Sequence, residues 1–307
     1  MKDISLSVIL PIYNGMPYLK EAIKSLLNQT FQDFIIYAID NGSTDKTRDF
    51  LLELNNDKIK YIWLEESNLV KALNIGLELA TTPFVARMDA DDISFPTRFE
   101  KQIEYLNENR EIDLVGTFGY YIGVDNRRHF RISLPINHND IILAMLKKRY
   151  AIIHASIMFR REIILPDNMY SKEYFPCEDF ELFLRIGDRI KFANIPERLY
   201  SLRIRDESIM QGQLKKSLEI YYTVSKLYAN NYTKDFEKDR DSNPLMSFLT
   251  KQDILSLMIY RKGLNYYLNK NLLVGMFYFF MSSLLNPFRL FNALKRRLLE
   301  LANYSSK

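Results

Sequence analysis

Residues 5–13 read SLSVILPIY, and the polar turn NGMP follows them directly at residues 14–17. An apolar run rich in β-branched side chains, ended by turn residues, is typical of a strand that is buried on both faces of a parallel sheet. Apolar side chains then recur at helical spacing over residues 19–27. The beginning of the chain therefore predicts one strand followed by one helix.

The same strand and helix unit repeats along the next 80 residues. Short polar connections separate the predicted elements, and strict alternation of this kind indicates an α/β fold. The fold class that we expect is a mostly parallel central sheet with helices on both faces. The further strands are predicted at 34–39, 59–64 and 84–88, and the further helices at 45–54, 69–80 and 96–109.

Polar and acidic side chains follow the predicted strands at their carboxyl ends. Ligands of open α/β sheets bind at these ends, so we expect a crevice lined by carboxylates. Aspartates supply the oxygen ligands that Mg²⁺ or Mn²⁺ prefers when it bridges to diphosphate. A second interpretation is that Asp91 and Asp92 only cap the helix that begins near Pro96. The strand-end residues are Tyr13, Asn14, Asp40, Asn41, Asp89, Asp91 and Asp92.

Several function classes are excluded or disfavoured by the composition. The turn after the first strand is not GxGxxG, and GxxxxGK[ST] is absent, which disfavours dinucleotide enzymes and P-loop enzymes. A formal charge of +4 over 307 residues argues against a nucleic-acid binder. One cysteine, Cys177, rules out a disulfide framework. The first residues do not resemble a signal peptide, so a cytoplasmic setting is expected.

Seven segments together resemble family 2 glycosyltransferases of the GT-A fold, especially the bacterial members that build surface polysaccharides. The segments occur in the order of that family and cover residues 5–208. The acidic segment at 86–106 is the most specific of them. They are SVILPIYNG (7–15), IDNGSTDKT (39–47), NLVKALNIGLELA (68–80), ARMDADDISFPTRFEKQIEYL (86–106), HASIMFRR (154–161), CEDFELFLRI (177–186) and ANIPERLYSLRIRDES (193–208).

The resemblance implies an inverting transferase that moves a sugar from a nucleoside-diphosphate sugar, expected to be a UDP-sugar, to an acceptor hydroxyl. It implies Asp179 as the catalytic base and Asp91 as the ligand of a divalent cation, Mn²⁺ or Mg²⁺. The acceptor would be a glycan or a lipid-linked glycan of polysaccharide or lipopolysaccharide assembly. The donor-binding residues that it implies are Pro11, Tyr13, Asp40, Asn41, Lys71, Asp89 and Arg205, and the acceptor-side or supporting residues are Asp92, His154, Glu178 and Arg203.

Two residues depart from the family pattern. Asn41 stands where a second aspartate is common, and Arg205 stands where a metal-ligating histidine is common. A guanidinium does not bind cations but matches phosphate geometry well. Ordinary structural roles stay open for other residues: strand-end packing for Tyr13, turn formation for Asp40, helix capping for Glu178 and core packing for His154.

The remaining 100 residues differ in charge from the part before them. Residues 1–200 carry 25 basic and 29 acidic side chains, a net charge of −4, whereas residues 201–307 carry 17 and 9, a net charge of +8. We expect a catalytic domain at 1–208, divided into a nucleotide-binding half (1–110) and an acceptor half (111–208). A helical, basic region at 209–307 would follow it.

That basic region contains an apolar run at 272–285 that is shorter than the roughly 20 residues of a membrane span. A basic amphipathic pattern at 287–299 follows, after a polar loop at 230–244. Such a pattern favours an anionic membrane surface as a partner, and hence a peripheral position on the inner face of the cell membrane. A helical bundle packed on the catalytic domain, with a solvated basic face, is the alternative.

Two other functions fit a carboxylate-lined α/β crevice. A sugar nucleotidyltransferase would use Mg²⁺ in a similar way, but it would give the Glu178–Asp179 pair no evident role. A degenerate, non-catalytic binder of nucleotide sugars is suggested by Asn41 and Arg205. The presence of Asp89, Asp91 and Asp179 favours the glycosyltransferase over both.

Overall fold

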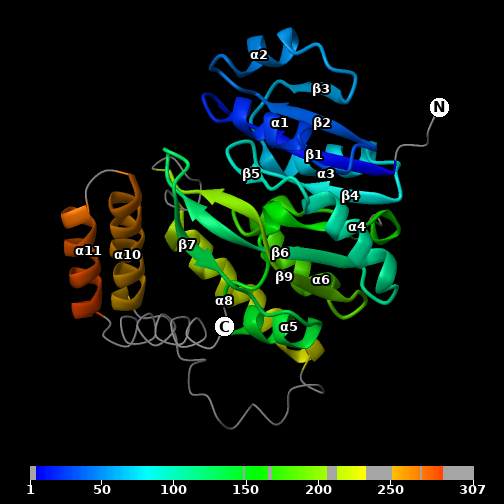
Figure 1. The fold of residues 1–307 in the computed structure, drawn as a ribbon. Helices are drawn as coiled ribbons and strands as arrows, with labels where there is room; N and C mark the ends of the chain where they lie inside the picture. The colour runs from blue at the N-terminus through cyan, green and yellow to red at the C-terminus, as the bar shows by residue number, and fades with distance from the viewer. Residues whose placement is uncertain are drawn as a thin grey trace, which may run out of the picture.

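The computed structural model describes residues 5–147, 149–164, 168–205, 213–232, 251–269 and 272–285 (Figure 1). One mixed sheet forms the centre of the described molecule, with the strand order β3-β2-β1-β4-β8-β6-β9-β5 and with β7 paired to β6. The strands are β1 (Leu6–Ile12), β2 (Phe34–Asn41), β3 (Ile59–Leu64), β4 (Phe84–Arg87), β5 (Ile93–Ser94), β6 (Leu114–Ile122), β7 (Arg128–Ile132), β8 (Met158–Arg160) and β9 (Phe192–Arg203).

The first four strands are parallel, as the alternating pattern predicts. The helices that connect them begin and end close to the predicted positions. They are α1 (Leu19–Leu27), α2 (Thr47–Glu53) and α3 (Leu69–Leu79), and α4 (Arg98–Glu108) follows β4 and the short β5.

Helices cover this sheet on both faces, because alternate residues of each strand point in opposite directions. Val8 and Leu10 of β1 belong to the apolar core under α1 and α4, whereas Ile9 belongs to the core under α3. Helix α3 approaches β1 so closely that a Cβ on Gly76 would lie 2.4 Å from Cγ2 of Ile9. The two cores hold the carboxyl ends of β1, β2 and β4 in a fixed arrangement.

The second half of the sheet is less regular than the sequence predicts. Strand β8 is antiparallel to β4 and to β6, β7 is antiparallel to β6, and β9 is parallel to β6. Strand β5 pairs antiparallel with β9, and this pairing brings the acidic segment after β4 against the end of β9. The other helices of this half are α5 (His138–Leu146) and α6 (Glu178–Ile186), and the 3₁₀ turns are η1 (His154–Ser156), η2 (Arg161–Ile163) and η4 (Lys172–Tyr174).

The described C-terminal part is helical, as expected. It contains α8 (Leu214–Ala229), the 3₁₀ turn η5 (Asn230–Tyr232), α10 (Lys251–Asn269) and α11 (Leu272–Leu285). Helices α10 and α11 lie side by side at one side of the molecule (Figure 1). No helix in the described ranges is both long enough and apolar enough to cross a membrane. The predicted boundary at 208, the loop residues 233–244 and the basic segment 287–299 lie outside the described residues.

Candidate active site

The ends of β1 and β2 bring the predicted base-binding residues together. Ile12 pairs with Asp40 in the sheet register, and Tyr13 follows Ile12 with 47% of its surface exposed. Asp40 is fully buried, and its carboxylate accepts the backbone N–H of Ser43 at 3.0 Å. The hydroxyl of Tyr61 donates to the other carboxylate oxygen at 3.5 Å. Asp40 therefore shapes the turn after β2, while the ring of Tyr13 is open to solvent.

The two turns after these strands are tied to each other. Asn14 adopts a left-handed conformation with φ 48°, and its backbone N–H donates to Oγ of Ser43 at 2.9 Å. Its side-chain oxygen accepts the backbone N–H of Thr44 at 2.8 Å. Gly42 has φ 74°, a conformation that glycine adopts without strain. These bonds fix the backbone beside Tyr13, and Pro11 lies buried in β1 just before it.

Asn41 connects the end of β2 to the beginning of α3. Its side-chain oxygen accepts the backbone N–H of Asn68 at 2.6 Å, and Asn68 in turn caps α3 by accepting the backbone N–H of Lys71 at 3.0 Å. Lys71 lies on the first turn of α3 and lines an open hollow of about 510 Å³. The other residues that line this hollow are Asn68, Val70, Asn74, Ile75, Glu78, Tyr170 and Lys172.

Asp89 follows β4 and is held by a buried arginine. The guanidinium of Arg87 donates to both carboxylate oxygens of Asp89, at 3.0 and 2.5 Å. Arg87 is 5% exposed, and the backbone N–H of Asp89 donates to the hydroxyl of Tyr200 at 3.2 Å. Two-point contacts of this kind fix the orientation of the carboxylate. The carboxylate of Asp89 is thus partly exposed and has a fixed orientation at the end of β4.

Asp91 and Asp92 do not cap a helix, because α4 begins only at Arg98 with Thr97 as its N-cap. Oδ2 of Asp91 lies 2.7 Å from Nε of Arg205, so the two residues form an ion pair. Asp92 is buried and accepts the backbone N–H of Arg203 at 2.8 Å. Burial raises the pKa of Asp91, and Asp89 raises it further, while Arg205 lowers it. Burial and the neighbouring acids raise the pKa of Asp92 well above its usual value.

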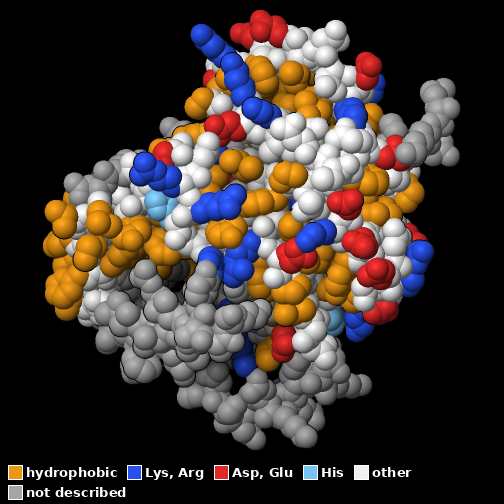
Figure 2. Space-filling view, in the orientation of Figure 1, with side chains coloured by type: hydrophobic (Ala, Val, Ile, Leu, Met, Phe, Trp, Pro, Cys, Tyr) orange, Lys and Arg blue, Asp and Glu red, His pale blue; other side chains and the backbone are white. Residues whose placement is uncertain are grey.

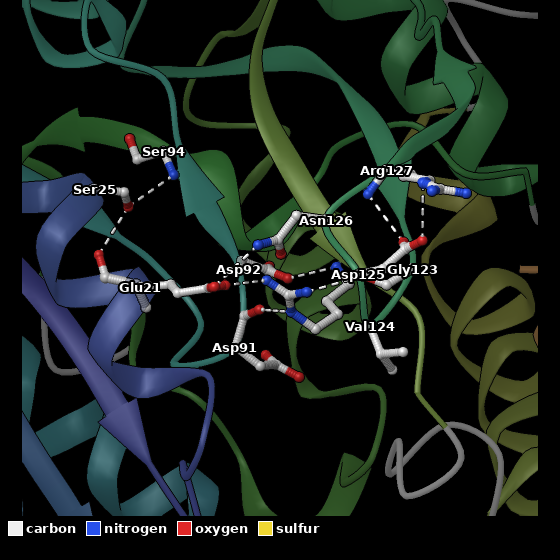
Figure 3. A network of polar contacts seen from close by, with 12 residues as sticks. Glu21, Ser25, Asp91, Asp92, Ser94, Gly123, Val124, Asp125, Asn126 and Arg127 are labelled. Carbon is white, nitrogen blue, oxygen red and sulfur yellow. Dashed lines mark hydrogen bonds and ion pairs between the residues drawn. The ribbon is translucent and has the colours of Figure 1, made fainter. Parts of the chain in front are cut away.

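Arg203 ties the acidic segment to two other parts of the molecule. Its side chain donates to the carbonyl of Asp91 at 2.7 Å, to the carbonyl of Gly123 at 2.9 Å and to the carboxylate of Glu21 at 3.0 Å. Its guanidinium also lies 4.5 Å from the ring centroid of Tyr18. Figure 3 shows Glu21 of α1, the two aspartates and the turn between β6 and β7 converging on this point. Arg203 thus holds the acidic segment, α1 and the turn between β6 and β7 together.

Replacing Arg203 by methionine is expected to lower the free energy of unfolding by about 2–4 kcal/mol, because buried carbonyls lose their donor. Urea unfolding measures this change directly. The matched control is Arg127→Met, in the same turn, whose side chain is 82% exposed. Equal stability of the two variants would contradict the supporting role of Arg203.

Asp179 lies at the first turn of α6, where His154 and Tyr170 lie behind it. Nδ1 of His154 is 3.7 Å from Oδ2 of Asp179, and Nε2 of His154 is 2.7 Å from the hydroxyl of Tyr170. Burial lowers the pKa of His154 well below its usual value, so the ring is neutral. When the Tyr170 hydroxyl donates to Nε2, the proton of the neutral ring is on Nδ1, facing Asp179. His154 belongs to the 3₁₀ turn η1, just before β8.

Asp179, the predicted base, lies close enough to Arg87 and Asp89 for their charges to shift its pKa. Burial raises the pKa of Asp179, while the charge of Arg87 lowers it and that of Asp89 raises it. Glu178 is 5% exposed, and burial together with Asp179 raises its pKa to about 7. The structure therefore brings Asp89, Asp91, Asp92, His154, Glu178, Asp179, Arg203 and Arg205 to one region of the sheet edge.

Several residues that contact this region were not predicted from the sequence. Tyr170 and Tyr200 contact His154 and Asp89, yet isolated tyrosines carry no motif. Arg98 lies in the PTRFEKQ segment that was informative for the family, and it is fully buried. Its guanidinium donates to the carbonyl of Arg87 at 2.7 Å and thus supports the end of β4 from below. Glu21 reads in the sequence as one more polar residue of an amphipathic helix.

Comparison with known proteins identifies the family. The profile of glycosyl transferase family 2 matches residues 7–165, which include the strand ends and the acidic segment. The chain belongs to glycosyl transferase family 2. Within this family, the O-antigen biosynthesis glycosyltransferase WbnJ of Escherichia coli is 33% identical over 216 residues, which cover 68% of this chain and 83% of WbnJ.

Other relatives agree with this assignment. An uncharacterised glycosyltransferase of Haemophilus influenzae is 34% identical over 211 residues, covering 64% of this chain and 65% of that protein. The crystal structure of S. aureus TarS has a TM-score of 0.58 at 21% identity and covers 86% of this chain, but only 43% of the TarS chain. TarS 1–349 in complex with UDP-GlcNAc has a TM-score of 0.56 at 17% identity, covering 84% of this chain and 81% of that one. The GT-A fold predicted from the sequence is confirmed.

Proposed function

We propose that this chain transfers a sugar, with inversion, from a UDP-sugar to a hydroxyl of a glycan or lipid-linked glycan acceptor. The observation that carries the proposal is the position of Asp179 within electrostatic reach of Arg87 and Asp89. Arg87 bonds to both carboxylate oxygens of Asp89, and its charge also acts on Asp179, whose side chain is 31% exposed. The name of WbnJ, an O-antigen biosynthesis enzyme, supports a polysaccharide or lipopolysaccharide acceptor. The catalytic domain would comprise residues 1–208.

The donor site of this proposal follows the edge of the sheet from β2 to β4. The exposed ring of Tyr13 offers a stacking surface for the base, and Asp40 lies beside it at the end of β2. Asp89 would accept a hydrogen bond from the ribose. The guanidinium of Arg205 would pair with the diphosphate once donor enters. The complex of TarS 1–349 with UDP-GlcNAc supports a uridine nucleotide.

A divalent cation, Mn²⁺ or Mg²⁺, fits the donor set of this region. The carboxylate of Asp91 would offer a hard-oxygen ligand; burial raises its pKa and the charge of Asp89 raises it further, and a cation would relieve both effects. Among the described residues, no three His, Cys, Asp or Glu side chains are grouped to hold a metal by themselves. Asp91 would therefore hold the cation together with diphosphate oxygens. When bound, the cation would neutralise charge that develops on the leaving diphosphate.

Arg205 competes with a cation for Asp91 because the two side chains form an ion pair. Replacing Arg205 by alanine is therefore expected to lower the concentration of Mn²⁺ that gives half-maximal activity, and to raise KM for the donor. Activity measured against Mn²⁺ and donor concentrations tests both effects, with Arg189→Ala on the surface beside α6 as control. An unchanged Mn²⁺ requirement would show that the pair does not oppose the cation.

The chemical step assigns the proton to Asp179. As the acceptor oxygen attacks the anomeric carbon, its proton passes to the carboxylate of Asp179, and the bond from that carbon to the diphosphate oxygen breaks. Attack on the face opposite the leaving diphosphate inverts the configuration. His154, held by Tyr170, would orient Asp179 for this transfer as a positioning residue.

The activity is expected to fall at acidic pH earlier than an ordinary aspartate would require. Asp179 acts only when it is deprotonated, and burial raises its pKa. The active form therefore exists above this raised pKa and is lost as the pH falls through it. A profile of kcat/KM against pH should show its acidic limb above the ordinary aspartate value of about 3.9. Activity that stays constant down to that value would contradict Asp179 as the base.

Nucleotide binding distinguishes this proposal from its alternatives. Calorimetric titration of the full chain in the presence of Mn²⁺ should show a higher affinity for UDP and UDP-sugars than for ADP or GDP. A sugar nucleotidyltransferase would instead convert UTP and a sugar phosphate to a UDP-sugar and pyrophosphate. A degenerate binder would bind UDP-sugars without transferring the sugar to any acceptor or to water, so no UDP would be released. Failure to bind any nucleoside diphosphate would refute the donor site itself.

A further inference from the structure

Helix α11 exposes large apolar side chains along one face. None of its 14 residues is charged. The exposed fractions are 75% for Leu273, 54% for Met276, 58% for Phe277, 60% for Phe280 and 60% for Leu284. Their spacing of three, one, three and four residues places them on one side of a helix. We call these five residues the α11 face; Figure 2 shows the apolar side chains gathered over α10 and α11.

The opposite side of α11 packs against α10 through the small residues Gly275 and Ser282 and through the rings of Tyr278 and Phe279, whose centroids lie 5.5 Å from that of Tyr266 and 5.2 Å from that of Tyr260. Gly275 is buried, and a Cβ there would lie 2.6 Å from the backbone nitrogen of Tyr267. The side chains of Ser256 and Ser282 are buried and bond to each other at 3.1 Å. A water-soluble helix usually turns its large apolar residues inward. Helix α11 turns two aromatic rings toward α10 but leaves Leu273, Phe277 and Phe280 exposed, and an exposed apolar patch of this kind marks an interaction surface for an apolar partner.

The charge of the adjacent sequence indicates the nature of that partner. Residues 286–307, which follow α11 directly, contain five basic residues, Arg289, Lys295, Arg296, Arg297 and Lys307, against one acidic residue, Glu300. Residues 201–307 as a whole carry a net charge of +8. An apolar face that is followed in the sequence by a cationic segment is complementary to an anionic lipid surface, in which acyl chains lie under acidic headgroups.

The size of the face favours a lipid surface over a second copy of the chain. A helix of 14 residues is about 21 Å long and 10–12 Å across. A stable protein interface buries about 800 Å² on each partner, which is more than one side of such a helix offers. We propose that the α11 face docks on the surface of an anionic lipid bilayer, with the helix lying in the plane of the headgroups.

Docking at this face would place the crevice near the bilayer. Asn269 at the end of α10 accepts the backbone N–H of Val124 at 2.9 Å and donates to the carbonyl of Ile204 at 2.8 Å. Val124 follows Gly123, the partner of Arg203, and Ile204 lies between Arg203 and Arg205. The two helices are thus anchored beside the acidic segment, so an acceptor carried by lipid would be presented on the same side of the molecule.

Sedimentation of the full chain with lipid vesicles tests the docking. Vesicles of phosphatidylcholine mixed with phosphatidylglycerol should bind the chain, and added salt or pure phosphatidylcholine should weaken the binding. The triple variant Leu273→Ser, Phe277→Ser, Phe280→Ser should bind the mixed vesicles at least about tenfold more weakly, because three apolar side chains no longer enter the bilayer. The matched control changes two exposed leucines elsewhere, Leu52→Ser and Leu227→Ser, and should bind like the unchanged chain.

Two further measurements keep the test decisive. Binding of UDP is expected to be the same in the triple variant and the unchanged chain, which separates loss of docking from loss of folding and from failure of the proposed chemistry. Docking is refuted if the unchanged chain ignores the mixed vesicles or if the triple variant binds them equally well. It is also refuted if light scattering finds a dimer that the triple variant converts to a monomer, because the α11 face would then contact a second copy.

Discussion

Replacing Asp179 by asparagine is expected to lower the rate of sugar transfer by about 10²–10⁴-fold, the usual contribution of a positioned general base. Asparagine keeps the size of the side chain but cannot accept the proton of the acceptor. Asp179 lies on α6, apart from the strand ends that would hold the nucleotide, so the affinity for UDP should be unchanged. Transfer rates and UDP titration together measure the two effects.

The control for this experiment is Asp188→Asn. Asp188 is an exposed aspartate just after the end of α6 and pairs only loosely with Arg189, at 3.7 Å. Its variant should transfer sugar at the original rate. If Asp179→Asn retained half of the activity, Asp179 would not be the base, and Glu178 would become the acid to examine, since its pKa lies at about 7.

Replacing Asp91 by alanine is expected to lower donor turnover by about 10²-fold or more, because the diphosphate loses its positioned cation. The variant should also lose most of the Mn²⁺ dependence of donor binding. The side chain of Asp91 is 18% exposed. Because it forms an ion pair with Arg205, the substitution also removes that contact. Release of UDP from a UDP-sugar, followed at several Mn²⁺ concentrations, measures both changes.

The exposed aspartate Asp57, in the loop between α2 and β3, provides the matched control. Asp57→Ala should keep the original turnover and Mn²⁺ dependence. Thermal unfolding of Asp91→Ala should remain cooperative, because the backbone of the segment is still held by Arg203. Full turnover by Asp91→Ala, with the same Mn²⁺ requirement, would contradict its assignment as the metal ligand.

The parallel half of the fold was predictable because its local and tertiary signals agree. Strand β3 occupies the predicted residues 59–64, and β1, β2 and β4 lie within one or two residues of their predicted ends. Strands β1, β2 and β4 are apolar runs bounded by turn residues and are largely buried in the two cores, whereas β3 is a partly exposed strand at the edge of the sheet. Helix α3 was equally readable, and α11 coincides with the apolar run at 272–285.

The antiparallel half was not predictable in the same way. Strand β5 has two residues and β8 has three, which is too short for a period to appear in the sequence. Their position depends on partners far along the chain, such as Ser201, which pairs with Ile93. His154 lies in a 3₁₀ turn that directly precedes β8, and no local pattern separates the turn from the strand.

The candidate site divides along the same line. Residues at strand ends, such as Asp40 and Asp89, could be read from their position after an apolar run. The interactions of Arg203 with Glu21 and Gly123 join segments that are 182 and 80 residues apart, and no local pattern indicates them. The ion pair between Arg205 and Asp91 is equally non-local, although the resemblance marked Arg205 as a departure.

We infer that the acidic region at the end of β4, beside Asp179, binds and cleaves a UDP-sugar. The most direct test is to incubate the purified chain with Mn²⁺ or Mg²⁺ and each common nucleotide sugar, and to follow release of the nucleoside diphosphate. We predict slow release of UDP that requires the cation, depends on one or a few sugars, and is lost in Asp91→Ala. If the chain neither bound nor cleaved any nucleotide sugar, the proposed donor site would be wrong.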